Sequence, residues 1–365
     1  MNYVYTKGGR RHRLRALALL GVLVGACDAD RLTTSDTPAT LGNVASDSAE
    51  LASDSASLAG DSAAVADSLA LTDSLTPVDT LEISASLSRR GGTPFGPDGL
   101  WASYTDMRKN HQLFSASLNS DSPSGIIKRI NAARTYHHQL MLVLAGGAHK
   151  NYITRGRFDL TKWKRRMDGY RQANIQSAVR AAVADGTVIG NNIMDEPNHP
   201  SWGGVMTKPL LDRMAAYVKG IFPTLPVGVS IRWDWRSNER YKTIDFIVTQ
   251  YVSRFGSVTA WRNNAMAAAR ENRIALAFAF NPLNGGTKIR GCPLGRTGGK
   301  GTYAGNCRMT PAQIREAGFA LGSSACAVLM WKYDAGFMSK AANIKAFRDV
   351  GAKLASNSRQ SCRRS

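Results

Sequence analysis

Two adjacent carboxylates in the middle of the chain are the residues best suited to chemistry. Asp195 and Glu196 come directly after a short apolar and β-branched run, 187–194, and Pro197 follows them. Such a run is typical of a buried parallel strand, and a proline ends a strand because it cannot donate a backbone hydrogen bond. Parallel α/β folds place their active-site loops at the carboxyl ends of their strands. The pattern therefore predicts that both carboxyl groups lie in an active-site loop, where they can donate or accept protons.

The elements that position these carboxylates alternate between strands and helices. Apolar stretches of strand length occur at 100–105, 113–118, 140–144, 187–194, 227–233, 244–252, 274–280 and 325–331. Helical stretches separate most of them, and the long one at 160–184 is expected to break near Gly169. About eight strands separated by helices predict a single (β/α)8 TIM barrel. A doubly wound open sheet is the alternative, but no Gly-rich phosphate-binding turn follows the first strand.

Around residues 195–197 the chain resembles the large clan of glycoside hydrolase barrels, whose acid/base Glu lies in an Asn-Glu-Pro motif after the fourth strand. Counting from the stretch at 100–105 makes 187–194 the fourth strand. The resemblance implies a barrel that cleaves O-glycosidic bonds of a polysaccharide, with Glu196 as the proton donor. The chain departs from the clan in having Asp195 where the clan has Asn. Its seventh strand ends in Phe280-Asn281-Pro282, without the expected nucleophilic Glu.

A second carboxylate must therefore come from elsewhere, and three readings are open. Asp234 and Asp334 each follow a strand and are replacement candidates. The Asp195-Glu196 pair also resembles that of hexosaminidase-type barrels, in which the substrate's acetamido group attacks; this implies that Asp195 orients that group. In the third reading both acids bind arginines, and the protein is a non-catalytic surface lipoprotein that binds a glycan or another polyanion.

The residues just past each strand share one rim of a barrel, and here they are rich in amides and aromatic rings. Flat indole faces suit stacking on sugar rings, although each tryptophan can instead cap the core. The predicted substrate-binding residues are Trp101, His149, Asn198, His199, Trp233, Trp235, Gln250, Tyr251, Asn281 and Trp331.

Metal binding is a weaker alternative at this rim. His149 and His199 can reach a metal ion together with Asp195 or Glu196, but nothing in the sequence fixes their spacing. The prediction is a site without metal or cofactor.

The first 90 residues differ from the rest. A basic patch and a short apolar run, 14–24, are typical of an export signal, and Val24-Gly25-Ala26-Cys27 resembles a bacterial lipobox. That resemblance implies cleavage before Cys27, a lipid on its thiol, and a location in the bacterial cell envelope. Residues 28–87 are rich in Asp, Ser and Ala, which favours a disordered tether over a coiled-coil stalk. The predicted segments are a signal peptide (1–26), an acidic linker (27–90), the barrel (91–357) and a basic tail (358–365).

The net charge limits the kinds of partner that the chain can bind, and the cysteines predict disulfides. Residues 1–27 carry a net charge of +5 and residues 28–87 carry −10, so the overall +20 leaves +25 on residues 88–365. This surplus attracts polyanions, so acidic polysaccharide, nucleic acid and an anionic membrane surface are all candidate partners. The bases are spread along the domain, which fits simple solvation of the charges equally well. Of the polyanions we expect an acidic polysaccharide and not nucleic acid. Cys292 and Cys307 flank a Gly-rich basic segment, 282–309, and are predicted to form a disulfide. Cys326 lies in an apolar run and is either a buried free thiol or paired with Cys362.

Overall fold

The computed structural model describes residues 91–100, 108–146, 149–295 and 306–365. Eight parallel strands form one sheet in the order β1-β10-β9-β8-β7-β6-β3-β2. A parallel bridge between Asp98 and Leu118 joins the first strand to the second and closes the ring. The strands are β1 (Phe95–Pro97), β2 (Ala116–Ser120), β3 (Gln139–Val143), β6 (Val188–Asp195), β7 (Val227–Ser230), β8 (Phe246–Tyr251), β9 (Ala275–Phe280) and β10 (Ala327–Met330). The predicted (β/α)8 barrel is confirmed.

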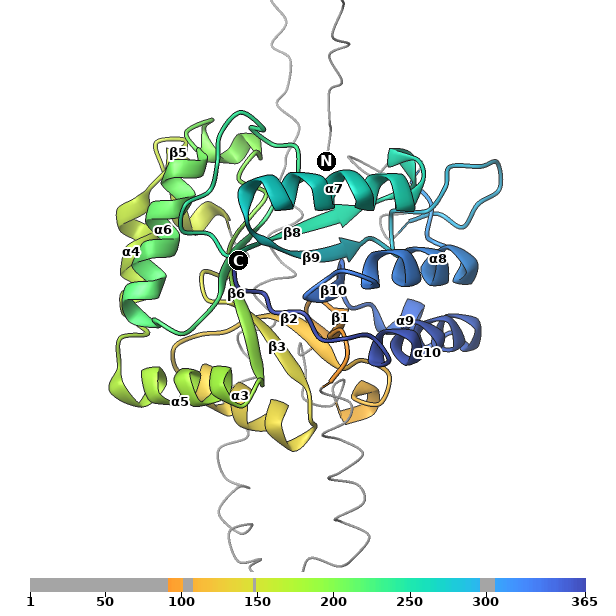
Figure 1. Ribbon diagram of the computed structural model, residues 1–365, viewed down its shortest axis with the longest axis horizontal. Helices are drawn as coiled ribbons and strands as arrows, with labels where there is room; N and C mark the ends of the chain where they lie inside the picture. Colours follow the sequence, from red (N-terminus) through yellow and green to blue (C-terminus); the bar gives the residue numbers. More distant parts are fainter. Residues whose placement is uncertain (1–90, 101–107, 147–148, 296–305) are drawn as a thin grey trace, which may run out of the picture. The chain divides into compact units, whose positions relative to one another are not determined.

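Helices surround the ring and cover its outer face (Figure 1). They are α3 (Ile126–Thr135), α4 (Leu160–Asp168), α5 (Ala173–Ala184), α6 (Lys208–Ile221), α7 (Val258–Asn272), α8 (Pro311–Gly322), α9 (Ala335–Met338) and α10 (Ala341–Ala355). The predicted break near Gly169 separates α4 from α5. Within the described ranges, β7 and β8 are joined without a helix. No helix in these ranges is long and apolar enough to cross a membrane.

Short elements add to the loops that follow the strands. They are the 3-10 turns η4 (His149–Tyr152), η5 (Pro200–Trp202) and η6 (Ser253–Phe255), and the hairpin strands β4 (Ile153–Thr154) and β5 (Arg157–Phe158).

The inside of the barrel is filled by an inner cluster of aliphatic, small and sulfur-containing side chains around one aromatic residue: Met141, Ile189, Phe246, Val248, Ala277, Ala279, Cys326, Ala327, Leu329 and Cys362. A Cβ added at Gly190 or Gly228 would lie 2.8 Å or 2.4 Å from the Phe246 side chain. These glycines, together with the alanines of the cluster, therefore make room for Phe246. The inside of the barrel is thus a packed core and not a pore, so a substrate would bind at its rim.

The C-terminal tail closes the floor of the ring. Cys362 forms a disulfide with Cys326, and both belong to the inner cluster. Arg364 donates to the carbonyl of Ile244, and Arg359 donates to that of Gly186. Both carbonyls lie shortly before the start of a strand, which places the tail beneath the amino ends of the strands. The free-thiol alternative for Cys326 is therefore wrong, because the tail brings Cys362 to it.

The first strand lies earlier in the chain than predicted. It spans Phe95–Pro97 and precedes the stretch 100–105, most of which lies outside the described residues. The strand count is unaffected, so β6 is the fourth strand and β9 the seventh, as predicted.

Candidate active site

Glu196 follows β6 at the carboxyl end of the ring in a left-handed backbone conformation. Its φ is 46°, a value that is uncommon for a residue with a side chain. Its amide donates to the carbonyl of Ser230 on the neighbouring strand at 2.9 Å. Burial raises the pKa of the Glu196 carboxyl, and its buried Oε1 has no hydrogen-bond partner among the described residues. A carboxyl group in this setting favours its protonated form.

The loop after Glu196 holds that backbone in place. The indole N–H of Trp202 and the amide of His199 both donate to the Glu196 carbonyl, at 2.9 Å and 2.8 Å. Trp202 is buried, and the ring of His149 packs on it with centroids 4.1 Å apart. The segment from Glu196 to Trp202 is thus closed on itself and fixed to the neighbouring loop.

Asp195 is the last residue of β6 and pairs in register with Ser230. A register irregularity between Asn192 and Asp195 turns the end of the strand, a common feature next to active sites. Asp195 is exposed to solvent, yet desolvation by the surrounding groups raises its pKa to about 7, with the Glu196 charge as the second cause.

Asp98 is a third carboxylate at the mouth, and the sequence reasoning missed it. It directly follows β1; its amide donates to the Met330 carbonyl, and its carbonyl accepts from the Tyr333 amide. Phe95, three residues earlier, packs in the outer cluster, which is the core between the strands and the surrounding helices. Because side chains alternate along a strand, Asp98 points to the inside of the barrel. The pKa of Asp98 is raised to about 7, first by burial and second by the charge of Asp195, while the Lys332 charge opposes the shift. Asp98 and Asp195 therefore interact across the mouth.

The two replacement carboxylates are already occupied in structural contacts. Asp234 forms a two-point ion pair with Arg232, whose Nε lies 2.5 Å from Oδ1. Asp334 caps α9, where its Oδ1 accepts from the Phe337 amide at 2.8 Å. Both carboxyl groups are engaged in these contacts, so neither residue is placed as well as Asp98 to be the partner of Glu196.

His149 and His199 come together as predicted, beside Trp202. Each Nδ1 lies within hydrogen-bond distance of the Ser201 hydroxyl, at 3.0 Å and 2.8 Å. Burial lowers the pKa of His149 to about 4, and the neighbouring His199 adds to the shift. Among the described residues no three His, Cys, Asp or Glu side chains cluster as metal ligands.

The remaining predicted substrate-binding residues differ in how far they are exposed to solvent. Trp233, Trp235 and Trp331 are half-buried and pack against the outer cluster near the rim. Asn198 is exposed in the turn after Glu196, and Gln250 is half-buried near the end of β8. Trp101 lies outside the described residues.

Tyr251 and Asn281 are structural, which corrects two predicted substrate contacts. Tyr251 is buried in the outer cluster, packs on Trp261 and donates its hydroxyl to the Gly256 carbonyl. It points outward because Val248, three residues earlier, belongs to the inner cluster. Asn281 is buried, and its Oδ1 accepts from the Asn284 amide, which shapes the loop after β9.

Comparison with known proteins gives only distant similarities. No protein-family model matches the sequence, and no curated protein matches it. A family 26 endo-β-1,4-mannanase from Cellulomonas fimi has a TM-score of 0.48 at 11% identity, covering 77% of each chain. A family 5 mannosidase from Rhizomucor miehei has 0.42 at 10%, covering 69% of this chain and 87% of its own. An endo-1,4-β-xylanase from Caldicellulosiruptor owensensis has 0.42 at 6%, covering 73% and 98%. At such values these similarities carry no information on the activity of this chain.

Proposed function

We propose that the mouth of the barrel cleaves glycosidic bonds of a polysaccharide by carboxylate acid/base chemistry. The observation that carries the proposal is the group of three carboxyls at the mouth, Asp98, Asp195 and Glu196, each with a raised pKa. Glycosidic cleavage needs one carboxyl that still holds a proton and a second that has lost it. Carboxyl groups whose pKa values are raised by burial, and whose charges disfavour one another, meet this need.

In this proposal Glu196 donates the proton to the departing oxygen. The charge of Asp195 raises the pKa of Asp98, so ionisation of one of these carboxyls disfavours ionisation of the other. The ionised member acts as nucleophile, as base for a water molecule, or, for an acetamido sugar, as the group that orients the substrate's own nucleophile. The half-buried Trp233, Trp235 and Trp331 give the rim aromatic faces for sugar rings.

The test is an isosteric substitution of the proton donor. Glu196→Gln keeps the shape of the side chain and removes its acid, so we expect release of reducing ends from a polysaccharide panel to fall by about 10²- to 10⁴-fold. Glu271→Gln, an exposed position on α7, is the matched control and should leave the rate unchanged.

A non-catalytic glycan-binding protein is the second candidate. It is favoured by Asn281, which gives the seventh strand no carboxylate, and by the Arg232–Asp234 ion pair. If the wild-type protein binds a glycan but releases no reducing ends from any member of the panel, this second function replaces the first.

We also propose that the protein is exported and anchored by a lipid on Cys27 in the bacterial cell envelope. The Cys292–Cys307 and Cys326–Cys362 disulfides support export, because disulfides form in oxidising compartments. In a bacterial host, the wild-type protein should incorporate labelled palmitate and partition into detergent. Cys27→Ser should abolish both; equal labelling of the variant would exclude this anchor.

A further inference from the structure

A basic cavity lies between two loops on the same rim as the carboxylates. Its volume is about 140 Å³, and Ser253, Arg254, Asn284, Thr287, Lys288 and Asn306 are among its lining residues. These loops follow β8 and β9, and the carboxyl ends of parallel strands lie at one end of a barrel. The cavity therefore opens at the end of the ring that carries Asp195 and Glu196.

The charge of this cavity has a single sign. Arg254 and Lys288 line it, and none of its described lining residues is an aspartate or glutamate. Both cationic side chains are exposed, and the guanidinium of Arg254 packs on the Phe255 ring at 5.4 Å. Hydroxyl and amide groups of Ser253, Thr287 and Asn306 provide neutral donors beside the two charges. This set of groups suits a small oxyanion, and the volume exceeds that of several water molecules.

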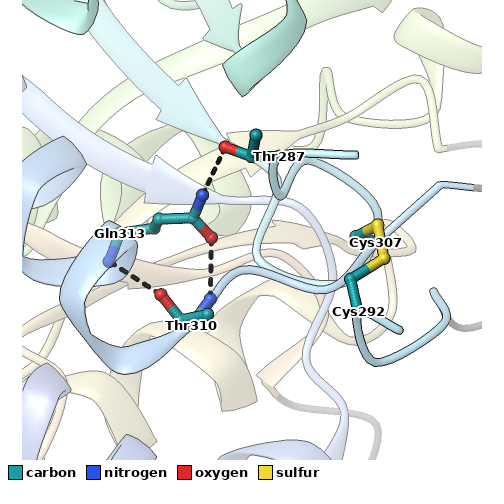
Figure 2. Close-up of a disulfide and its surroundings, with 5 residues drawn as sticks. All are labelled: Thr287, Cys292, Cys307, Thr310 and Gln313. Atoms are coloured by element: carbon teal, nitrogen blue, oxygen red, sulfur yellow. Dashed lines mark hydrogen bonds between the residues drawn. A yellow bond between two sulfur atoms is a disulfide. The ribbon is translucent and has the colours of Figure 1, made fainter. Parts of the chain in front are cut away.

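The loop after β9, which carries Lys288, is held by contacts on both sides of that residue, and Figure 2 shows these contacts. The Gln313 side chain, which caps α8 together with Thr310, also donates to the Thr287 hydroxyl at 2.5 Å. Beyond Lys288 the chain is held by the Cys292–Cys307 disulfide.

Two backbone hydrogen bonds connect the same segments. The Ser253 amide donates to the Gly285 carbonyl, which joins the loop after β8 to the loop after β9, and the Gly286 amide donates to the Cys307 carbonyl. Lys288 thus lies between two fixed points and lines the same cavity as Arg254. A site ordered before binding loses less entropy when the ligand arrives.

We propose that this cavity is a subsite for an anionic substituent, a carboxylate or a sulfate, on the glycan that the barrel mouth binds. The inference rests on the proposed function, because it names the substrate class of that same mouth. It also gives a specific location to part of the surplus positive charge of the barrel.

The test uses binding, so that it is independent of turnover. In the full-length Glu196→Gln background, affinity is measured by gel retardation for two matched pairs: polygalacturonate against its methyl ester, and dextran sulfate against dextran. We expect tighter binding of one charged member than of its neutral partner. Arg254→Gln with Lys288→Gln should weaken that binding by roughly tenfold or more, as loss of charge-assisted hydrogen bonds requires. The pair that responds tells a carboxylate subsite from a sulfate subsite.

The control changes the same charge elsewhere. Arg180→Gln with Lys353→Gln, at exposed positions on α5 and α10, should change the affinity less than twofold. An equal loss in the control pair, or no preference of the parent protein for either charged glycan, overturns the subsite.

The two proposals fail separately. If the wild-type protein cleaves only neutral glycans, the mouth is catalytic and the subsite is wrong. If the charged glycan binds through Arg254 and Lys288 but is never cleaved, the subsite stands and the hydrolase proposal falls.

Discussion

At the scale of single residues, the site depends on the backbone of Glu196. A left-handed conformation costs a residue with a Cβ about 1 kcal/mol or more, so neighbouring contacts must maintain it. The Trp202 indole and the His199 amide do so from one side, and the Ser230 carbonyl does so from the other. This arrangement directs the Glu196 side chain, and the loop is thereby part of the acid's function.

Trp202→Phe should therefore impair catalysis without removing any proposed catalytic group. The variant keeps an aromatic ring for His149 and loses the N–H that holds the Glu196 carbonyl. We expect kcat to fall by about tenfold, which corresponds to ~1.4 kcal/mol, with KM little changed and a displaced acidic limb in the pH profile. Trp261→Phe, at a buried position on α7, should lower stability and leave that profile unchanged. A Trp202 variant with the wild-type pH profile would refute the positioning role.

Asp98 gives stability a specific pH dependence. Its pKa rises from 3.8 to about 7 on folding, so the folded protein retains a proton that the unfolded chain releases between these values. The stabilising contribution of this proton is complete below about pH 4 and is lost as the pH rises through about 7. Asp98→Asn removes the dependence, and its melting temperature relative to wild type should rise from pH 4 to pH 8. We expect at least about 2–4 °C, the shift that ~1 kcal/mol produces in a domain of this size.

Asp349→Asn is the control for that experiment. Asp349 is partly exposed beside Lys345 and Arg315 on the outer layer. Asp349 lies away from the mouth, so the melting temperatures of its variant at pH 4 and pH 8 give the background for removing a carboxyl group elsewhere. A difference for Asp98→Asn that does not exceed this background would mean that the Asp98 carboxyl is not buried in the folded protein.

At the scale of elements, the loop after β9 depends on its disulfide. Cys292 and Cys307 are 15 residues apart, and closing a loop of this length is worth about 3 kcal/mol in the chain-entropy account. Replacing both with serine should expose the 287–307 segment to limited proteolysis at least several-fold faster. Cys326→Ser with Cys362→Ser should leave the cleavage rate of this segment unchanged. Equal protection of the loop without Cys292 and Cys307 would show that the Gln313–Thr287 contact alone holds it.

Local patterns predicted the central elements of the barrel well. The apolar run ending in Asp195 and Glu196 is a strand because its eight residues carry the pattern themselves, and the break at Gly169 is equally local. The three-residue β1 was missed because Gly96 and Pro97 are poor strand formers; its neighbours in the closed ring define it. Asp98 was missed with it, since the residue is identified as part of the rim only once the strand before it is known.

Two other features depend on the face of the sheet to which a side chain points and on contacts between residues far apart in the sequence. Tyr251 looked like a rim residue, but one step along a strand turns a side chain to the opposite face of the sheet. The Cys326–Cys362 pair joins residues 36 apart, and only the path of the tail beneath the ring brings them together.

At the scale of the whole molecule, the tail is a structural part of the barrel. Cys362 is buried in the inner cluster, and Arg359, Arg363 and Arg364 donate to carbonyls of Gly186, Thr224 and Ile244. The Cys326→Ser, Cys362→Ser variant should lose about 2–4 kcal/mol of unfolding free energy, measured by denaturant titration. Its catalytic rate well below the melting temperature should stay near wild type, because the rim is at the opposite end. A stability unchanged in this variant would mean that the arginines hold the tail without the disulfide.

The seam of the ring has a consequence for biogenesis. β1 pairs with β10, and Cys326 forms a disulfide with Cys362. The first strand of the ring therefore completes its pairing only when these late residues are present. A nascent polypeptide emerging from a ribosome or a translocation pore cannot finish this barrel until residue 362 has been released.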